Sequence, residues 1–253
     1  MSDAVVTHIA MPDGVKLAVH QMGPEDGAPV LMLHGLFSNA ETNWIKYGHA
    51  GRLAEAGFRV IMPEFRVHGQ SDAPHDPAAY PTDILADDIL HLIEMLALES
   101  FDLVGFSLGA RTSAKLLTMG LRPRRTALCG MGWQGLQEWD RRRQFFIDAI
   151  DKRETVKRGD EHFFAVAFMK TQGIDPVAAR LLLNSFGDID VEALTDIDTP
   201  IMVLCGSEDQ DNGSAPMLAQ NLAQAHYVEI PGTHMSSVTE KALGAALVAF
   251  LGE

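Results

Sequence analysis

The stretch Leu103-Val104-Gly105-Phe106-Ser107-Leu108-Gly109-Ala110-Arg111 joins an apolar run to a segment with helical character. Residues 101–105 predict a strand and residues 110–117 predict a helix, so Gly-Phe-Ser-Leu-Gly occupies the turn between them. A serine on so tight a turn has a strained backbone, and side chains on the flanking residues would collide there. Because glycines flank it, we expect the Ser107 hydroxyl to project above the end of the strand.

The helix that begins after Ser107 is the second part of this pattern. Its first backbone N–H groups have no partners within the helix, and they attract negative charge. For a nucleophilic serine, these N–H groups would bind the negative charge that develops during the reaction. The other interpretation is a plain Gly/Ser turn between a buried strand and a helix, in which these groups have no such role. Both interpretations stay open on the pentapeptide alone, because short motifs also occur by chance.

Composition bounds the class of protein and its partners. The chain has 253 residues, which suits one large α/β domain with or without an insertion, and 47% of them are hydrophobic. Lys and Arg total 20 against 34 Asp and Glu, a net charge of −14. Nucleic acids and anionic membranes bind clustered positive charge, so neither is an expected partner. We expect a small-molecule substrate, and the sequence leaves the oligomeric state open.

The first residues, the length of the apolar runs and the surroundings of the two cysteines predict the cellular location. No basic and apolar leader is visible at the start, and no apolar run approaches the roughly 18 residues of a membrane span. Cys129 and Cys205 each lie in an apolar run, which is typical of buried reduced thiols. These features predict a cytoplasmic protein.

Strand-like and helix-like segments alternate along most of the chain, which favours a mostly parallel sheet covered on both faces. The expected strands are residues 4–10, 15–20, 29–33, 58–62, 101–105, 126–131, 200–205 and 226–230. The expected helices are residues 41–56, 82–98, 110–120, 137–153, 161–171, 176–184, 215–223 and 237–251. Residues 133–198 contain no strand-like run. We therefore expect a core domain of residues 1–132 and 199–253, with residues 133–198 inserted as a helical cap.

A serine hydroxyl needs a base, and the base needs a group that orients it. His234 directly follows the last predicted strand, and Asp209 follows the strand before it, so both lie at the edge of the sheet where Ser107 emerges. Asp211 is a second candidate acid, but it lies farther from its strand and leads into a turn or a helix start. The order Ser, Asp, His favours Asp209.

With these residues the chain resembles the α/β-hydrolase-fold enzymes, and in particular their small, cap-bearing esterase and lipase-like members. The resemblance covers essentially the whole chain and rests on five features: His34-Gly35, the loop Arg66-Val67-His68-Gly69-Gln70-Ser71, the turn Gly105 to Gly109, Asp209 and His234. It implies an eight-stranded sheet flanked by helices and a catalytic triad of Ser107, Asp209 and His234. It also implies an oxyanion hole formed by the backbone N–H groups of Leu36 and Leu108.

The chain departs from the family in one loop. Relatives commonly read Asp-x-Arg-Gly-His-Gly-x-Ser, whereas this chain has Glu64 for the Asp and Val67 for the first Gly. We expect these changes to affect loop shape and Arg66 to hold the loop. Relatives that cleave carbon–halogen bonds or epoxides carry Asp at the nucleophile position, so Ser107 argues against both reactions.

Substrate specificity is expected to come from the helical segment, residues 133–198, which we expect to form the cap. Its apolar residues should mostly pack on the core while some line a pocket; they are Phe145-Phe146, Ile150, Phe163-Phe164, Val166, Phe168-Met169 and Leu181-Leu182-Leu183. For Arg111, on the helix behind Ser107, we expect a structural ion pair rather than substrate contact. Arg141-Arg142-Arg143 is typical of a solvated helix face.

The sequence thus predicts a serine hydrolase that cleaves a carboxylic ester of a small, largely apolar substrate through an acyl-enzyme on Ser107. The same triad could instead serve carbon–carbon, lactone or thioester cleavage, or a lyase step. A non-catalytic binding protein of the same fold is a third hypothesis, which the complete Ser, Asp, His set disfavours. No cofactor and no metal are expected, because no phosphate loop and no metal-ligand spacing are found.

Overall fold

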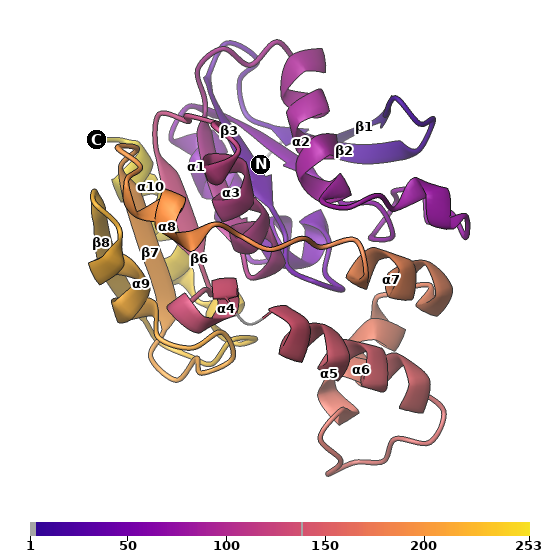
Figure 1. Ribbon diagram of the computed structural model, residues 1–253. Coiled ribbons are helices and arrows are strands. Elements are labelled where there is room, and N and C mark those ends of the chain that lie inside the picture. Colours follow the sequence, from indigo (N-terminus) through magenta and orange to yellow (C-terminus); the bar gives the residue numbers. More distant parts are fainter. Residues whose placement is uncertain (1–3, 138) are drawn as a thin grey trace.

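The computed structural model describes residues 4–137 and 139–253, and a twisted sheet forms its centre (Figure 1). Within this part of the chain the sheet has eight strands in the order β1-β2-β4-β3-β5-β6-β7-β8. The strands are β1 (Val5–Ala10), β2 (Lys16–Met22), β3 (Ala28–Leu33), β4 (Phe58–Pro63), β5 (Asp102–Phe106), β6 (Thr126–Cys129), β7 (Ile201–Gly206) and β8 (Ala225–Ile230). β2 pairs antiparallel with β1 and β4, and every later pairing is parallel, as the alternation predicts.

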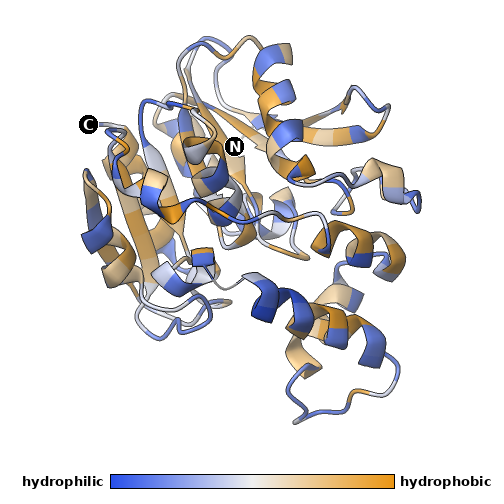
Figure 2. Ribbon diagram, viewed as in Figure 1, coloured by the Kyte–Doolittle hydropathy of each residue, from blue (hydrophilic) through white to orange (hydrophobic). Residues whose placement is uncertain are grey.

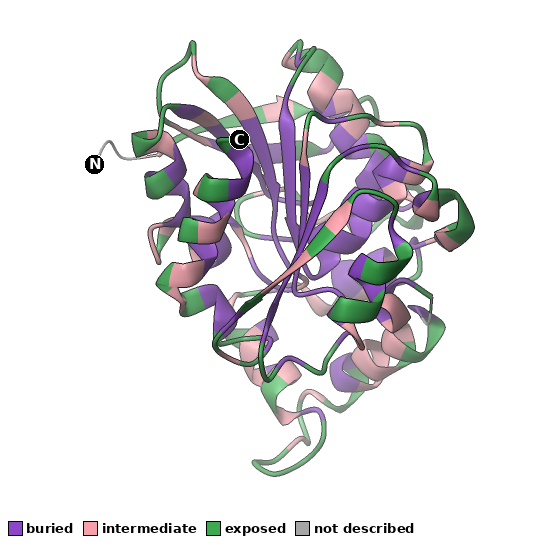
Figure 3. Cartoon of the chain, turned by 90° about the vertical axis from the view of Figure 1, so that its left-hand side faces the viewer, coloured by how far each residue is buried: buried purple, intermediate pink, exposed green. Residues whose placement is uncertain are grey.

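Helices cover both faces of this sheet, so the inner strands β2 to β7 are mostly buried, while the edge strands β1 and β8 are largely exposed or half-buried (Figure 3). The helices of the sheet domain are α1 (His49–Glu55), α2 (Ile84–Met95), α3 (Leu108–Thr118), α9 (Ala215–Asn221) and α10 (Lys241–Leu251). On β5, Leu103 packs into the core formed with α2 and α3, while Val104 packs into the core formed with α1 and α10. Successive strand residues point to opposite faces, which explains why these strands are hydrophobic along their length (Figure 2).

The prediction of one continuous helix at residues 41–56 is wrong, because the chain forms two elements there. A π-helical turn, Glu41–Ile45, is separated from α1 by Gly48, whose φ of 79° lies in the left-handed region. Glycine reaches this conformation without steric cost, so the chain turns there and starts a new helix. The last helix is also divided: a 3-10 turn, Ser237–Thr239, precedes α10.

Between β6 and β7 the described residues form helices joined by loops, and no strand. They are α4 (Trp133–Gln137), α5 (Trp139–Lys152), α6 (Phe163–Thr171), α7 (Pro176–Leu183) and α8 (Val191–Thr195). α5, α6 and α7 correspond to the three expected helices and lie together beside the sheet domain (Figure 1). The short helices α4 and α8 were not expected, and both contact α3 of the sheet domain. The division into a core and a cap stays a prediction.

None of the helices in residues 4–137 and 139–253 is long and apolar enough to cross a membrane.

Candidate active site

Ser107 occupies the turn between β5 and α3, and its backbone is strained as the sequence predicts, with φ 52° and ψ −108°. Its N–H donates to the Cys129 carbonyl at 2.8 Å, which ties the turn to β6. A Cβ on Gly105 would overlap the backbone carbonyl of Gly109, and a Cβ on Gly109 would overlap the carbonyl of Leu33. Only glycine fits at both positions, because the backbones of β3, the turn and α3 meet there.

The structure brings the three predicted triad residues together. His234, in the loop after β8, has Nε2 at 3.0 Å from the Ser107 Oγ, and its Nδ1 lies 2.8 Å from Oδ2 of Asp209. Asp209 follows β7, the neighbour of β8 in the sheet. All three side chains are buried, with residue exposures of 8% for Ser107, 6% for Asp209 and 9% for His234. Water therefore competes weakly for these hydrogen bonds.

Asp209 is held as an anion by its neighbours. Burial alone would raise the pKa of its carboxyl group, but the hydrogen bond and charge of His234 and the Asp211 N–H outweigh that effect and lower it. The Cys205 thiol also donates to Oδ2, at 3.3 Å. Asp211, the rival acid, is exposed, and in the described structure it meets Asp209 through its backbone N–H, at 3.1 Å from Oδ1.

Leu36 and Leu108 line the same cavity as Ser107. Over the described residues neither N–H has a hydrogen-bond acceptor. The N–H groups on either side of Leu36 are occupied: Gly35 donates to Asn43 Oδ1 and Phe37 donates to His68 Nε2, each at 3.0 Å. Free donors beside the serine can bind a developing negative charge.

Two buried histidines hold the loop that carries Leu36. His34 Nε2 accepts from the Phe65 N–H at 3.0 Å, and His68 Nε2 accepts from the Phe37 N–H. A backbone N–H can only donate, so each Nε2 is unprotonated. Burial lowers the pKa of His34 to about 4 and the pKa of His68 to about 3. The partner of His68 is a backbone N–H group, which no sequence motif marks.

Glu64, which departs from the family pattern, and Arg66, which keeps it, both hold this loop. Glu64 accepts from the N–H groups of Ala40 and Gln70, at 3.1 and 2.6 Å, so its longer side chain joins two loops. The fully buried Arg66 pairs with Asp88 through Nε and Nη2, at 2.8 and 2.6 Å. Arg66 therefore holds the loop, as expected.

The space above Ser107 is almost filled. A cavity of about 20 Å³ remains, which holds about one water molecule. Its walls include residues of α3, α4 and α5, and the lining residues are Leu36, Ser107, Leu108, Arg111, Met131, Gly135, Trp139, Arg142, Phe146 and Asn212. Among the expected apolar residues of the helical segment, only Phe146 is in this set. Phe164 is 81% exposed and does not reach it.

The expectations for two arginines are wrong. Arg111 forms no ion pair within the described structure; its Nη2 donates to the Gly187 carbonyl at 2.7 Å, and its guanidinium lies over Trp139. Arg142 does not sit on a solvated face, because α5 turns it toward Ser107, where it lines the cavity. Both positions depend on where α5 lies relative to α3, which helical periodicity does not show.

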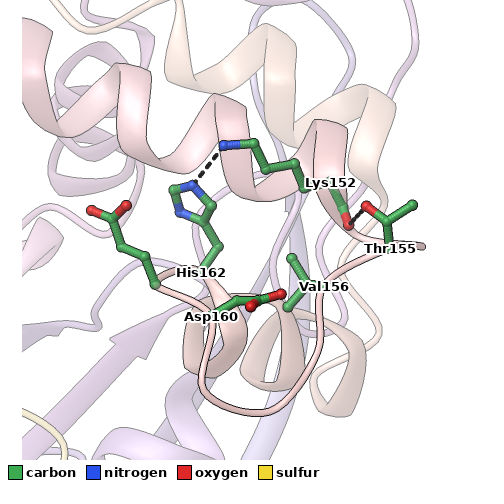
Figure 4. A pocket seen from close by; sticks show the side chains of 6 residues that line it. Lys152, Thr155, Val156, Asp160 and His162 are labelled. Atoms are coloured by element: carbon green, nitrogen blue, oxygen red, sulfur yellow. Dashed lines mark hydrogen bonds between the residues drawn. The ribbon is translucent and has the colours of Figure 1, made fainter.

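A larger hollow of about 250 Å³ lies within the helical segment, after the end of α5 (Figure 4). It is lined by Lys152, Thr155, Val156, Asp160, Glu161 and His162. His162 faces this hollow, with Nε2 at 3.1 Å from the Lys152 Nζ. No residue borders both spaces. In the described ranges no group of three or more His, Cys, Asp or Glu could hold a metal ion.

Part of the chain matches a known family and several curated proteins. A family model described as alpha/beta hydrolase fold matches residues 28–125. The AB hydrolase superfamily protein YfhM of Bacillus subtilis is 35% identical over 109 residues, which cover 42% of this chain and 36% of that protein. An epoxide hydrolase of Caballeronia sordidicola is 35% identical over 98 residues, covering 39% of this chain and 28% of that protein. The chain thus spans about a third of the length of these curated relatives.

A likeness over the whole chain is found among solved structures. The esterase EaEST of Exiguobacterium antarcticum superposes with a TM-score of 0.79 at 22% identity, covering 98% of this chain and 100% of the esterase. At that identity the likeness concerns the fold. Together with the family match over residues 28–125, it shows that this chain has the α/β-hydrolase fold.

Proposed function

We propose that the protein is a serine hydrolase that cleaves a carboxylic ester through an acyl-enzyme on Ser107. The observation that carries this proposal is the unbroken set of contacts from Ser107 Oγ to His234 Nε2, at 3.0 Å, and from His234 Nδ1 to Asp209 Oδ2, at 2.8 Å. A serine becomes nucleophilic when a neutral imidazole accepts its proton, and the imidazole must be oriented by a third group. Asp209, with its lowered pKa, is ionised and suits that role.

The first half of the proposed reaction acylates the serine. Ser107 Oγ attacks the ester carbonyl carbon while its proton passes to His234 Nε2. The carbonyl oxygen becomes an oxyanion, which the N–H groups of Leu36 and Leu108 bind. When this intermediate collapses, the bond between the carbonyl carbon and the alcohol oxygen breaks, and His234 Nε2 gives its proton to the departing alcohol.

The second half releases the acid. A water molecule gives a proton to His234 Nε2 and attacks the acyl carbon, and the same two N–H groups bind the second oxyanion. The bond to Ser107 Oγ then breaks, and His234 returns the proton to that oxygen. The products are a carboxylic acid, an alcohol and the free enzyme.

Ser107 also separates this proposal from epoxide opening, the reaction named for one relative. Relatives that open epoxides carry Asp at the nucleophile position, as noted above. A serine there favours acyl transfer. We further propose that residues 133–198 act as a cap, since Trp139, Arg142 and Phe146 of α5 border the cavity above Ser107.

A fluorophosphonate probe tests the proposal, because it reacts with activated serines. We expect one adduct on Ser107 by intact mass and peptide mapping, hydrolysis of p-nitrophenyl esters, and loss of both in Ser107→Ala. Ser100→Ala, at an exposed turn before β5, is the matched control and should keep both. Labelling that persists in Ser107→Ala would overturn the assignment. A parallel panel of acyl thioesters separates ester from thioester cleavage.

A further inference from the structure

The charged side chains that border the cavity above Ser107 are both arginines. In the described part of the chain, Arg111 from α3 and Arg142 from α5 line it, and no Asp, Glu, Lys or His does so. This is unexpected in a chain with a net charge of −14. The walls of the cavity therefore have a charge opposite to that of the molecule.

Arg111 is the more deeply buried of the two, with only 4% of its surface exposed. Its Nη2 donates to the Gly187 carbonyl, while its Nε is buried and has no hydrogen-bond partner in the described structure. Trp139 and Phe186 lie beside the guanidinium, with ring centroids 5.0 and 5.9 Å from Cζ. The Arg111 side chain is thus held beside two aromatic rings, and its Nε–H donor has no acceptor in the described structure.

Nearby carboxylates do not neutralise Arg111 directly. Asp83 is bound by Lys115 at 2.8 Å and by the Gly187 N–H at 2.9 Å, and it lies beyond ion-pair distance from Arg111. Burial lowers the pKa of Arg111 to about 10, while the charges of Asp83 and Asp188 partly oppose this. The guanidinium is still charged at neutral pH, so a buried cation without a bound anion borders the cavity.

Arg142 brings a second guanidinium to the same space. Its Nη1 donates to the Asp211 carbonyl, a neutral acceptor, and its Cζ lies 5.8 Å from the ring centroid of Phe146. Burying a cation with only neutral acceptors costs free energy, and an anionic ligand at the cavity would recover it. Guanidinium groups bind carboxylates well, because their planar N–H donors match the two oxygens.

We propose that Arg111, together with Arg142, forms a subsite for a carboxylate of the substrate, so that the ester cleaved at Ser107 also carries a free acid group. This inference rests on the proposed function, and it replaces the largely apolar substrate expected from the sequence. The guanidinium groups bind that acid group while the N–H groups of Leu36 and Leu108 bind the reacting carbonyl oxygen.

The test compares each acidic ester with its own methyl ester. One pair is mono-p-nitrophenyl glutarate and its methyl ester, with the acid on the acyl part. The other is 4-acetoxybenzoate and its methyl ester, with the acid on the alcohol part. We expect wild type to prefer the acid in at least one pair. In Arg111→Met, which keeps an unbranched side chain between the rings, the ratio of kcat/KM for acid to methyl ester should fall about 10- to 100-fold.

Further variants separate recognition from packing. Arg111→Lys keeps the charge and should retain part of the ratio, and Arg142→Met, at a less buried position, should also lower it. Arg143→Gln is the matched control, since Arg143 pairs with Asp140 at 2.9 Å and does not line the cavity. An equal loss for both members of a pair, or an unchanged ratio in both arginine variants, would overturn the subsite.

Two measurements distinguish failure of the carboxylate subsite from failure of the proposed ester hydrolysis. Labelling of Ser107 by fluorophosphonate with an unchanged ratio overturns the subsite alone. If no ester is cleaved, titration calorimetry with glutarate still decides the subsite. Binding that weakens about tenfold or more in Arg111→Met supports it, and absent or equal binding overturns it.

Discussion

At the scale of single residues, the site depends on protonation states that hydrogen-bond partners impose. His34 and His68 each accept from a backbone N–H through Nε2, and each is fully buried. Protonation of either ring would break the hydrogen bond and place a charge in the interior. Asp209 has the opposite requirement, since it must remain an anion to orient His234.

The first residue-scale prediction concerns the acid that orients His234. Asp209→Asn should lower kcat by about 10⁴, the size of loss known for this change in the serine-protease triad, because the amide favours the wrong imidazole tautomer. Asp211→Asn is the matched control. It keeps the backbone N–H that donates to Asp209, so its kcat should stay within about threefold of wild type. The reverse ranking in kcat, with both variants folded by circular dichroism, would move the triad acid to Asp211.

The second concerns pH and stability. The pKa of His34 falls from 6.5 to about 4 on folding, so between these values the unfolded chain binds more protons than the folded one. Stability is therefore full above about pH 6.5 and decreases as the pH falls toward 4, by on the order of 3 kcal/mol for His34. Urea unfolding at pH 7 and pH 5 measures this difference.

Two variants give that experiment its control. His34→Gln should reduce the difference in unfolding free energy between the two pH values, because the titrating group is gone. His226→Gln, at an exposed position of β8, should leave it as in wild type. A wild-type stability that does not change between pH 7 and pH 5 would contradict the neutral, buried state of His34.

At the scale of elements, α5 decides what can lie above Ser107. Its residues Trp139, Arg142 and Phe146 form one wall of the cavity, while Phe146 also packs against Phe37, with ring centroids 5.6 Å apart. One helix therefore contacts the loop that carries Leu36 and closes the cavity. We therefore expect its side chains to limit the length of the acyl group in the proposed acyl-enzyme.

The prediction at this scale is a change in chain-length preference. Phe146→Ala removes an aromatic side chain from the cavity wall, so kcat/KM for a hexanoate ester should rise about tenfold relative to an acetate ester. Phe164→Ala is the matched control on α6, where the side chain is 81% exposed, and its ratio should match wild type. An unchanged ratio in a folded Phe146→Ala would show that this side chain serves packing alone.

At the scale of the whole molecule, the site is assembled from distant parts of the chain and then covered. A cavity of about 20 Å³ leaves little room above Ser107, so we expect α5 to shift when a substrate binds. Gln172, after α6, connects the helical segment to the loop after β3: its Oε1 accepts from Asn39 Nδ2 at 3.0 Å and Thr42 Oγ1 at 3.3 Å. These contacts favour the closed arrangement.

Gln172→Ala should therefore make the site easier to open. Labelling of Ser107 by a bulky fluorophosphonate should become about 3- to 10-fold faster relative to a small one, since two hydrogen bonds that favour closure are lost. Gln144→Ala, on the exposed face of α5, is the control and should keep the wild-type ratio. Equal rates for both probes in wild type would contradict the need for opening.

The local pattern of the chain determined most of the sheet domain. The alternation of strands and helices is visible in short windows of sequence. So is the turn that holds Ser107 between Gly105 and Gly109. Side chains that follow parallel strands meet at one sheet edge whatever the distance between them in sequence, which is why Asp209 and His234 could be predicted to approach Ser107. Their catalytic roles stay predictions.

Tertiary structure alone decided the rest. The short helices α4 and α8 are held by contacts with α3, and Gly48 ends a helix that periodicity would continue. The same holds for the arginines. Whether Arg111 and Arg142 meet a carboxylate, solvent or the cavity above Ser107 depends on where α5 folds back on the sheet domain. Helical periodicity defines the face on which a side chain lies, but not what that face will pack against.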